Sequence, residues 1–309
     1  MLPPVDAPAR DDSPARPEPG PVEAGVHMAG AAAGDIAGLL DPGGAGDPLN
    51  ERDPAYIRET LPALRALSRL YFRADVRGLD NIPAVGPVLL VGNHSGGTMI
   101  ADTFVLAQAF YDHFGPERPF HQLAHDLLFK VPGARALVQR YGTIAASPEN
   151  MKRALDRDAA LLVYPGGDHE TYRPSWESEE IGFAGRTGFV TLALEHNIPI
   201  VPVVAIGGQE SALFLGRGRR LATALQHNRL LRLKVLPLAI GPPFGLTVLD
   251  LPGRIPLPSK ITIRVLDPID LRDRLSPEPD PEQAYRLVSS TMQQRLTALG
   301  RSRRFPVIG

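Results

Sequence analysis

The chain has 309 residues and no cysteine, so it is long enough to bury a sizeable core but forms neither disulfides nor thiolate metal sites. Its formal net charge of −1 provides no global basic field of the kind that nucleic-acid-binding proteins carry. No run of 18 or more apolar residues occurs, and we therefore expect no transmembrane helix.

The first part of the chain, residues 1–52, is rich in proline, glycine, alanine and acidic residues and has few large apolar side chains. Burial of such a segment does not offset the entropy lost on ordering, so we predict a disordered tail. The tail lacks the basic start and apolar core of a secretory signal. We expect a folded domain over residues 53–300 and a short basic tail over 301–309. The lack of cysteine is consistent with a reducing cytoplasm.

The folded part shows alternating helix and strand patterns. An amphipathic helix is predicted to begin at Asp53-Pro54, where a capping residue precedes a first-turn proline. We predict strands at 75–78, 88–91, 142–145, 160–164, 199–206 and 261–266. We predict further helices at 98–114, 123–130, 134–141, 147–157, 187–196 and 281–299. This rhythm indicates a single α/β domain, with a mostly parallel or mixed sheet flanked by helices.

One stretch, residues 87–102, places titratable groups where such folds bind ligands. The strand at 88–91 is followed by His94 and the flexible turn Ser95-Gly96-Gly97, and Thr98 then caps a helix that carries Asp102. A neutral histidine can remove a proton from a hydroxyl near neutral pH, and a carboxylate on its other nitrogen would fix the tautomer. The alternative is that His94 only satisfies backbone groups at this turn.

Two further stretches follow later strands. The strand at 160–164 ends in Pro165, Gly166 and Gly167, whose backbone can approach a ligand closely, and Glu170 and Arg173 crowd the same loop. The alternative is an ordinary solvated turn. Arg186 precedes the helix predicted at 187–196, where it could meet an anionic group or be a surface charge. Three strands end in glycine, and their loops could converge on one cleft.

Four motifs in this order resemble the glycerolipid O-acyltransferases: Asn93-His94…Asp102, Tyr164-Pro-Gly-Gly…Glu170, Arg186-Thr-Gly-Phe-Val190 and Ile198-Pro-Ile-Val-Pro-Val-Val204. The resemblance covers roughly residues 70–270 and implies an acyltransferase-like fold.

The resemblance also implies a reaction. His94 would act as general base and Asp102 would orient it, while an acyl group moves from acyl-CoA to a lipid hydroxyl. Acyl-CoA would be a co-substrate, and neither a further cofactor nor a metal is required. Backbone N–H groups of the glycines would stabilise the oxyanion. The substrate-binding residues would be Ser95, Gly96, Gly97, Pro165, Gly166, Gly167, Glu170, Arg173 and Arg186.

The chain departs from the family pattern at two points. The family usually places the aspartate five positions after the histidine, whereas Asp102 lies eight after His94. Enzymes that act on phosphate-bearing acceptors usually show Phe-Pro-Glu-Gly-Thr-Arg, where this chain has Gly166 and His169 in place of the Glu and the Arg. This version looks more like the monoacylglycerol and diacylglycerol acyltransferases and the plant phytyl-ester synthases. It favours a neutral alcohol such as diacylglycerol, with lysophosphatidate as the alternative.

Other hypotheses stay open. Residues 93–97 are close to the Gly-x-Ser-x-Gly elbow of serine hydrolases, which would make Ser95 a nucleophile. A non-catalytic lipid-binding protein is a further alternative. His121 and His125 have metal-ligand spacing, but no third ligand is evident, so we interpret them as packing or capping residues.

A lipid substrate implies contact with a membrane surface, and we expect a peripheral protein on the cytoplasmic face. Two stretches could make this contact. One is apolar and proline-rich, at residues 236–258. The other is a basic cluster that would attract anionic lipid, formed by Arg217, Arg219, Arg220, Arg229, Arg232 and Lys234.

Overall fold

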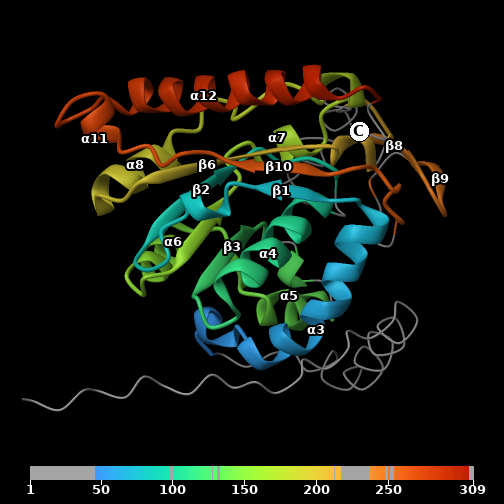
Figure 1. Cartoon of the computed structure of the whole chain (residues 1–309), viewed down its shortest axis with the longest axis horizontal. Coiled ribbons are helices and arrows are strands. Elements are labelled where there is room, and N and C mark those ends of the chain that lie inside the picture. The colour runs from blue at the N-terminus through green and yellow to red at the C-terminus, as the bar shows by residue number, and fades with distance from the viewer. Residues whose placement is uncertain are drawn as a thin grey trace, which may run out of the picture.

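A seven-stranded sheet organises the structure, which is a computed structural model that describes residues 46–97, 100–126, 128–130, 133–211, 213–216, 237–247, 250 and 254–305 (Figure 1). The strand order is β1-β10-β6-β2-β5-β3-β4. The strands are β1 (Asp75–Arg77), β2 (Val88–Gly92), β3 (Phe120–Ala124), β4 (Thr143–Ala145), β5 (Ala160–Val163), β6 (Ile200–Ile206) and β10 (Thr262–Val265). All neighbouring pairs are parallel except β10 with β6, which confirms the predicted α/β domain with a mostly parallel sheet.

Helices cover both faces of this sheet, with α12 on one side and α3 and α4 on the other (Figure 1). The α-helices are α3 (Pro54–Ala66), α4 (Ala101–Phe114), α5 (Ala134–Arg140), α6 (Pro148–Leu155), α7 (Gly167–Thr171), α8 (Gly188–His196), α11 (Leu271–Arg274) and α12 (Pro281–Ser302). The shorter turns are η1 (Pro48–Glu51), η2 (Leu67–Tyr71), η3 (Leu79–Asn81), η4 (Leu128–Lys130), η5 (Ser175–Glu177) and η6 (Gln209–Ser211). No helix among the described ranges is both long and apolar enough to span a bilayer.

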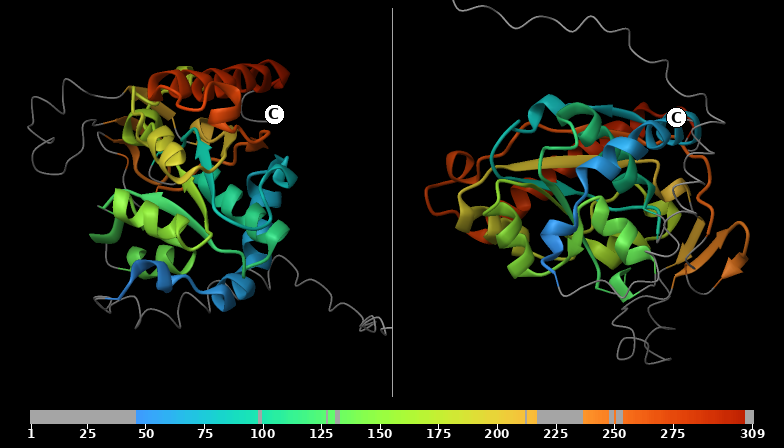
Figure 2. Two further views of the ribbon diagram at one scale, coloured as in Figure 1. Left: turned by 90° about the vertical axis from the view of Figure 1, so that its left-hand side faces the viewer. Right: turned by 90° about the horizontal axis from the view of Figure 1, so that it is seen from below.

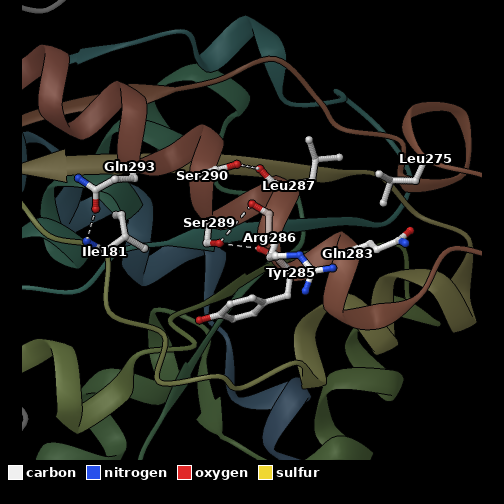
Figure 3. Close-up of a pocket in the computed structure, with 9 residues that line it drawn as sticks. All are labelled: Ile181, Leu275, Gln283, Tyr285, Arg286, Leu287, Ser289, Ser290 and Gln293. Atoms are coloured by element: carbon white, nitrogen blue, oxygen red, sulfur yellow. Dashed lines mark hydrogen bonds between the residues drawn. The ribbon is translucent and has the colours of Figure 1, made fainter.

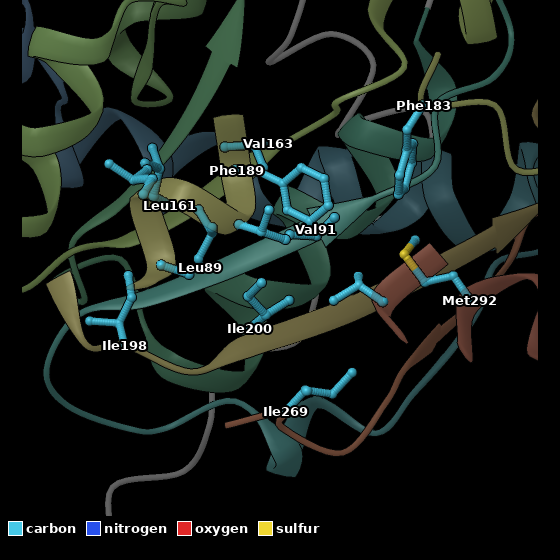
Figure 4. Close-up of a cluster of buried hydrophobic side chains, with 14 of the residues drawn as sticks. Leu89, Val91, Leu161, Val163, Phe183, Phe189, Ile198, Ile200, Ile269 and Met292 are labelled. Carbon is cyan, nitrogen blue, oxygen red and sulfur yellow. The ribbon is translucent and has the colours of Figure 1, made fainter. Parts of the chain in front are cut away.

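The alternation of side chains along β2 explains why the sheet needs both layers. Leu89 and Val91 point into the cluster beneath α8 and α12, and Val88 and Leu90 point into the cluster beneath α3 and α4. All four are fully buried. Figure 4 shows the first cluster, in which Leu89 and Val91 lie beside Phe189 and Ile200. A strand that is buried on both faces reads as a continuous apolar run, which is why β2 was predictable.

Local capping signals set the starts of several helices. The Asp53 carboxylate accepts the first-turn N–H groups of α3, and Pro54 follows it at the first helical position, as predicted. The Ser147 hydroxyl caps α6 in the same way. The helix predicted at 98–114 is present as α4, but the predicted cap was wrong: the cap position is Ile100, and residues 98 and 99 lie outside the described ranges.

Three segments differ from the sequence-based expectation. The helix predicted at 123–130 is replaced by β3 and η4, because residues 120–124 pair with β5 on one side and β4 on the other. Residues 47–52, assigned to the tail, pack on the domain through buried Leu49 and through ion pairs of Asp47 with α6 and Arg157. The predicted C-terminal basic tail begins as the end of α12, and Arg303 pairs with Glu210.

A second, three-stranded antiparallel sheet was not predicted. It is formed by β7 (Leu213–Gly216), β8 (Leu238–Gly241) and β9 (Gly245–Thr247). The hairpin of β8 and β9 stands at the rim of the molecule in Figure 1 and in the right-hand view of Figure 2. Part of the apolar stretch at 236–258 therefore forms strands, whereas the basic cluster between residues 217 and 234 lies outside the described ranges.

Candidate active site

Three loops meet at one edge of the large sheet. The strands β6, β2 and β5 are adjacent and parallel, so their carboxyl ends lie together. The loop after β2 carries His94, the loop after β5 carries Tyr164, and the loop after β6 carries Gln209. The predicted convergence of three glycine-containing strand ends is confirmed, and it brings the sequence motifs into one cluster.

His94 and Asp102 lie in contact within this cluster. The Nδ1 atom of His94 is 3.6 Å from Oδ2 of Asp102, and their side chains are 13% and 1% exposed. Ser95 donates to the same carboxylate oxygen, through its backbone N–H at 2.9 Å and its hydroxyl at 3.1 Å. The eight-residue spacing therefore still allows the pair to meet, because the chain turns after His94 and Asp102 lies in the first turn of α4.

The imidazole is held from one face by an aromatic ring. His94 stacks on Tyr164 with ring centroids 4.2 Å apart and an interplanar angle of 21°. The Tyr164 hydroxyl hydrogen-bonds with the Thr103 hydroxyl at 2.9 Å. Burial, reinforced by the charge of Asp102, raises the pKa of Tyr164 well above its usual value, so this hydroxyl stays protonated. Nδ1 of His94 is buried and has no hydrogen-bond partner among the described residues, and the Asp102 carboxylate lies 3.6 Å from it.

Asn93 fixes the backbone that carries His94. Its amide donates to the Ala205 carbonyl of β6 and accepts from the Ala205 N–H, each at 2.8 Å. Both bonds are buried, so the side chain extends the ladder between β2 and β6 by one step. The turn that follows therefore starts from a fixed position.

Glu170 joins the second loop to the first and is a positioning group. One carboxylate oxygen accepts the backbone N–H of His94 at 3.0 Å, and the other accepts the N–H of Gly182 at 3.0 Å. The carboxylate is fully buried, and burial raises its pKa despite the nearby Arg173. A Cβ atom on Gly166 would overlap this side chain, so Gly166 is what allows Glu170 to pack here. The expectation that Glu170 contacts substrate is corrected, because it is enclosed by protein.

The two arginines expected to bind substrate are also engaged within the protein. Arg173 is buried, and its guanidinium lies 3.2 Å from Glu170. Arg186 donates to the carbonyls of Pro165 and Gly166 at 2.8 and 2.9 Å and pairs with Asp168 at 3.1 Å. The interpretation of Arg173 as a ligand-facing residue is therefore wrong, whereas Arg186 lies at the loop as expected but braces its carbonyls.

Three residues that the sequence analysis missed hold the turn after His94. Gln209 accepts the Gly96 N–H at 3.3 Å and donates to the Arg173 carbonyl at 2.5 Å, which links the three loops. Arg254 donates to the Gly96 carbonyl at 2.9 Å and forms a buried ion pair with Asp250 at 2.6 Å. Their distance from His94 along the chain hides them from any local pattern.

The Asp250 carboxylate also lies against Gly97. This glycine has a φ of +71°, and a Cβ atom on it would overlap the carboxylate. The turn therefore requires glycine at this position both for its backbone conformation and for the close approach of Asp250.

Two of the glycine N–H groups expected to stabilise an oxyanion are already used. The Gly96 N–H donates to Gln209, and the Gly167 N–H donates to the Tyr164 carbonyl at 3.1 Å. Ser95 is buried and its hydroxyl donates to Asp102, and its backbone φ is not in the left-handed region. Both features differ from an exposed nucleophile on a strained elbow, which disfavours the hydrolase hypothesis.

The histidines with metal-ligand spacing have separate environments. His121 is buried in β3 and its Nδ1 lies 3.0 Å from the Gly142 carbonyl, whereas His125 is exposed. Burial lowers the pKa of His121 to about 4. Within the described ranges, no group of three or more potential metal ligands is brought together.

A shallow groove lies apart from the His94 cluster. It has a volume of about 610 Å³ and runs along α12 beside Ile181. Figure 3 shows its lining, in which Gln293 reaches the backbone of Ile181. None of the residues that line it belongs to the three loops around His94.

Comparisons with known proteins agree with this geometry. A family model described as Acyltransferase matches residues 73–206, the part that carries His94, Asp102 and the loop at 164–170. The uncharacterized protein Rv0502 of Mycobacterium tuberculosis is 32% identical over 247 residues, which are 79% of this chain and 66% of that protein. This chain therefore spans slightly less than two thirds of that relative.

Two more distant similarities point the same way. A Bos taurus protein named DGAT1/2-independent enzyme synthesizing storage lipids is 30% identical over 147 residues, 48% of this chain and 42% of that one. The crystal structure of the 1-acyl-sn-glycerophosphate acyltransferase PlsC from Thermotoga maritima superposes with a TM-score of 0.52 at 16% identity. The superposition covers 92% of this chain and 97% of the PlsC chain, and it shows that the two proteins share a fold. Residues 73–206 of this chain therefore belong to the acyltransferase family.

Proposed function

We propose that this protein transfers a fatty acyl group from acyl-CoA to the hydroxyl of a neutral lipid, with His94 as the general base. The observation that carries the proposal is the contact of His94 Nδ1 with the buried Asp102 carboxylate at the carboxyl edge of the sheet. A carboxylate on Nδ1 leaves Nε2 as the nitrogen that meets the acceptor.

The reaction follows from these positions. Nε2 of His94 takes the proton of the acceptor hydroxyl as its oxygen attacks the thioester carbonyl carbon. The C–S bond then breaks, and the departing CoA thiolate takes the proton from the imidazolium. Asp102 stabilises the imidazolium in between, and the Tyr164 ring and the bond of Glu170 to the His94 backbone limit its movement.

The state of the nearby arginines supports a neutral acceptor. A phosphate-bearing acceptor needs an uncommitted cation or a cluster of N–H donors. Arg173 is buried against Glu170, and Arg186 is hydrogen-bonded to two carbonyls and to Asp168. The Bos taurus relative is named for storage lipids, which agrees with a neutral product. A lipid acceptor also implies peripheral contact with a membrane, for which we propose the cytoplasmic face.

Thiol release from long-chain acyl-CoA tests the proposal. The purified chain is assayed with diacylglycerol, monoacylglycerol, a fatty alcohol and lysophosphatidate, in parallel with His94→Ala. We expect turnover with a neutral alcohol and a loss of at least about a hundredfold in the variant. Turnover with lysophosphatidate alone would overturn the acceptor, and near-normal turnover of His94→Ala would overturn the mechanism.

Ser95→Ala separates the proposal from the hydrolase hypothesis. The variant loses one hydrogen bond to Asp102 but keeps the backbone N–H bond to the same oxygen. We expect most of the activity to remain. Loss of all turnover in a folded Ser95→Ala protein, together with acyl-CoA hydrolysis by the wild type without an acceptor, would indicate a serine nucleophile.

A further inference from the structure

The outer face of the three-stranded sheet is an exposed apolar surface. Leu213 of β7 lies directly opposite Ile240 of β8, and Ile240 lies opposite Leu246 of β9. Side chains at directly opposed positions point to the same side of a sheet. Leu213 and Leu246 are 46% and 63% exposed, and Ile240 is half-buried. These three side chains, which we call the apolar row, therefore run across all three strands.

The opposite face of the same sheet packs on the candidate active site. Phe214 and Ala239, which alternate with the apolar row, are fully buried. The Phe214 ring fills the space beside Gly97 and lies 6.0 Å from the Arg254 guanidinium. One layer of strands thus separates the apolar row from the turn that carries His94.

More exposed apolar side chains surround the row. Leu215 on β7, Phe244 on the turn between β8 and β9, and Ile255 are each about half exposed. The backbone of Ile255 donates to the Pro242 carbonyl, which ties it to this hairpin. Exposed apolar patches of this kind on a soluble domain mark interaction sites.

The charge of the connecting chain identifies the kind of partner. Residues 217–236 join β7 to β8, so both ends of this segment leave from the sheet that carries the row. The segment contains six Arg or Lys residues and no Asp or Glu. A second copy of the chain would bring two such segments together, and their like charges would repel. An anionic lipid surface would attract them.

We propose that the apolar row docks on an anionic phospholipid bilayer and so places the active-site turn next to the membrane that holds the acceptor. The inference rests on the proposed function, because a lipid acceptor is the reason for the protein to approach a bilayer. Its evidence, however, is the sheet register, the exposure and the charge, none of which involves His94.

Flotation with vesicles tests the surface directly. The full chain is mixed with phosphatidylglycerol–phosphatidylcholine vesicles, and the bound fraction is compared between the wild type and the double variant Leu213→Glu/Leu246→Glu. Removing one leucine from the bilayer lowers the partition coefficient about tenfold, so we expect the double variant to bind about a hundredfold more weakly. The matched control is Val85→Glu, since Val85 is 80% exposed but lies before β2, at the end of that strand remote from His94. We expect the control to bind like the wild type.

The outcomes separate the two proposals. Equal flotation of the wild type and the double variant, or binding that salt abolishes and the leucines do not affect, would overturn the role of the row. A wild-type dimer that the double variant dissociates would make the row a protein interface and would also overturn it. Flotation is independent of turnover, so a His94→Ala protein that still floats would show that the apolar row binds the bilayer without catalysis. A protein that floats but never transfers an acyl group would refute only the proposed function.

Discussion

Replacing Asp102 by Asn tests the central contact of the proposed mechanism. The change keeps the shape of the side chain but removes the negative charge 3.6 Å from His94 Nδ1. At an effective dielectric constant of about 20, a charge pair at this distance interacts with about 4.6 kcal/mol. If this interaction is present only once the imidazolium has formed, its loss lowers kcat by about two- to three-thousandfold.

The assay is thiol release at saturating acyl-CoA, with kcat and KM determined separately. We expect kcat to fall and KM to change little, because Asp102 is buried and accepts its bonds from Ser95 and Thr103. Asp168→Asn is the matched control, since it neutralises an acid on the neighbouring loop that pairs with Arg186. Its kcat should stay within a few-fold of the wild type.

Folding must be checked separately, because the Asn side chain can turn its amide nitrogen toward the Ser95 N–H donor. Thermal unfolding of the variant gives the fraction that is native at the assay temperature. A native Asp102→Asn protein whose kcat lies within tenfold of the wild type would refute the argument. Asp102 would then only shape the turn after His94.

Other predictions concern stability. Gly166→Ala would push a methyl group into Glu170, so we expect the free energy of unfolding to fall by about 1–3 kcal/mol and the activity to fall with it. The control is Gly188→Ala, whose methyl group meets open space and should not destabilise the protein. Urea denaturation compares the two variants. Burial lowers the pKa of His121 to about 4 in the folded protein, against 6.5 for an unperturbed histidine. As the pH falls from 6.5 to 4, the free energy of unfolding should therefore decrease by about 3 kcal/mol more in the wild type than in His121→Asn. Arg254→Met should cost about 3–5 kcal/mol because it leaves its buried acidic partner uncompensated, and neutralising that partner as well should restore much of the loss. Equal stability in any of these comparisons would contradict the packing described.

The parts of the fold that were predictable carry their signal locally. The strands β2 and β6 are apolar runs that end at glycine or asparagine, and α3 has both a cap and a first-turn proline. The strand β3 has no such signal, since the apolar residues from 123 onward mimic helical spacing. It is a strand because two neighbouring strands pair with it, and this tertiary preference outweighs the local one.

The candidate site divides in the same way. His94, Asp102, Gly166 and Glu170 were found because they lie in short motifs after strands, although Glu170 proved to hold the His94 backbone and not a ligand. The buried pair of Arg254 and its acid could not be found, since Arg254 meets Gly96 across 158 positions of the chain. From its sequence neighbours alone, Arg254 would be predicted to be a surface charge, and only the fold brings it to the turn after His94.

The spacing of eight residues between His94 and Asp102 depends on those distant contacts. If a helix had started at His94, the two side chains would lie about 12 Å apart along its axis. Here α4 starts at Ala101, and the buried backbone groups of Ser95 and Gly96 in the turn before it need partners. Ser95 uses Asp102 itself, and the Gly96 N–H and carbonyl use Gln209 and Arg254. The longer turn and these remote side chains therefore form one unit. Removal of the remote partners should displace Asp102 from the imidazole without any change in the motif.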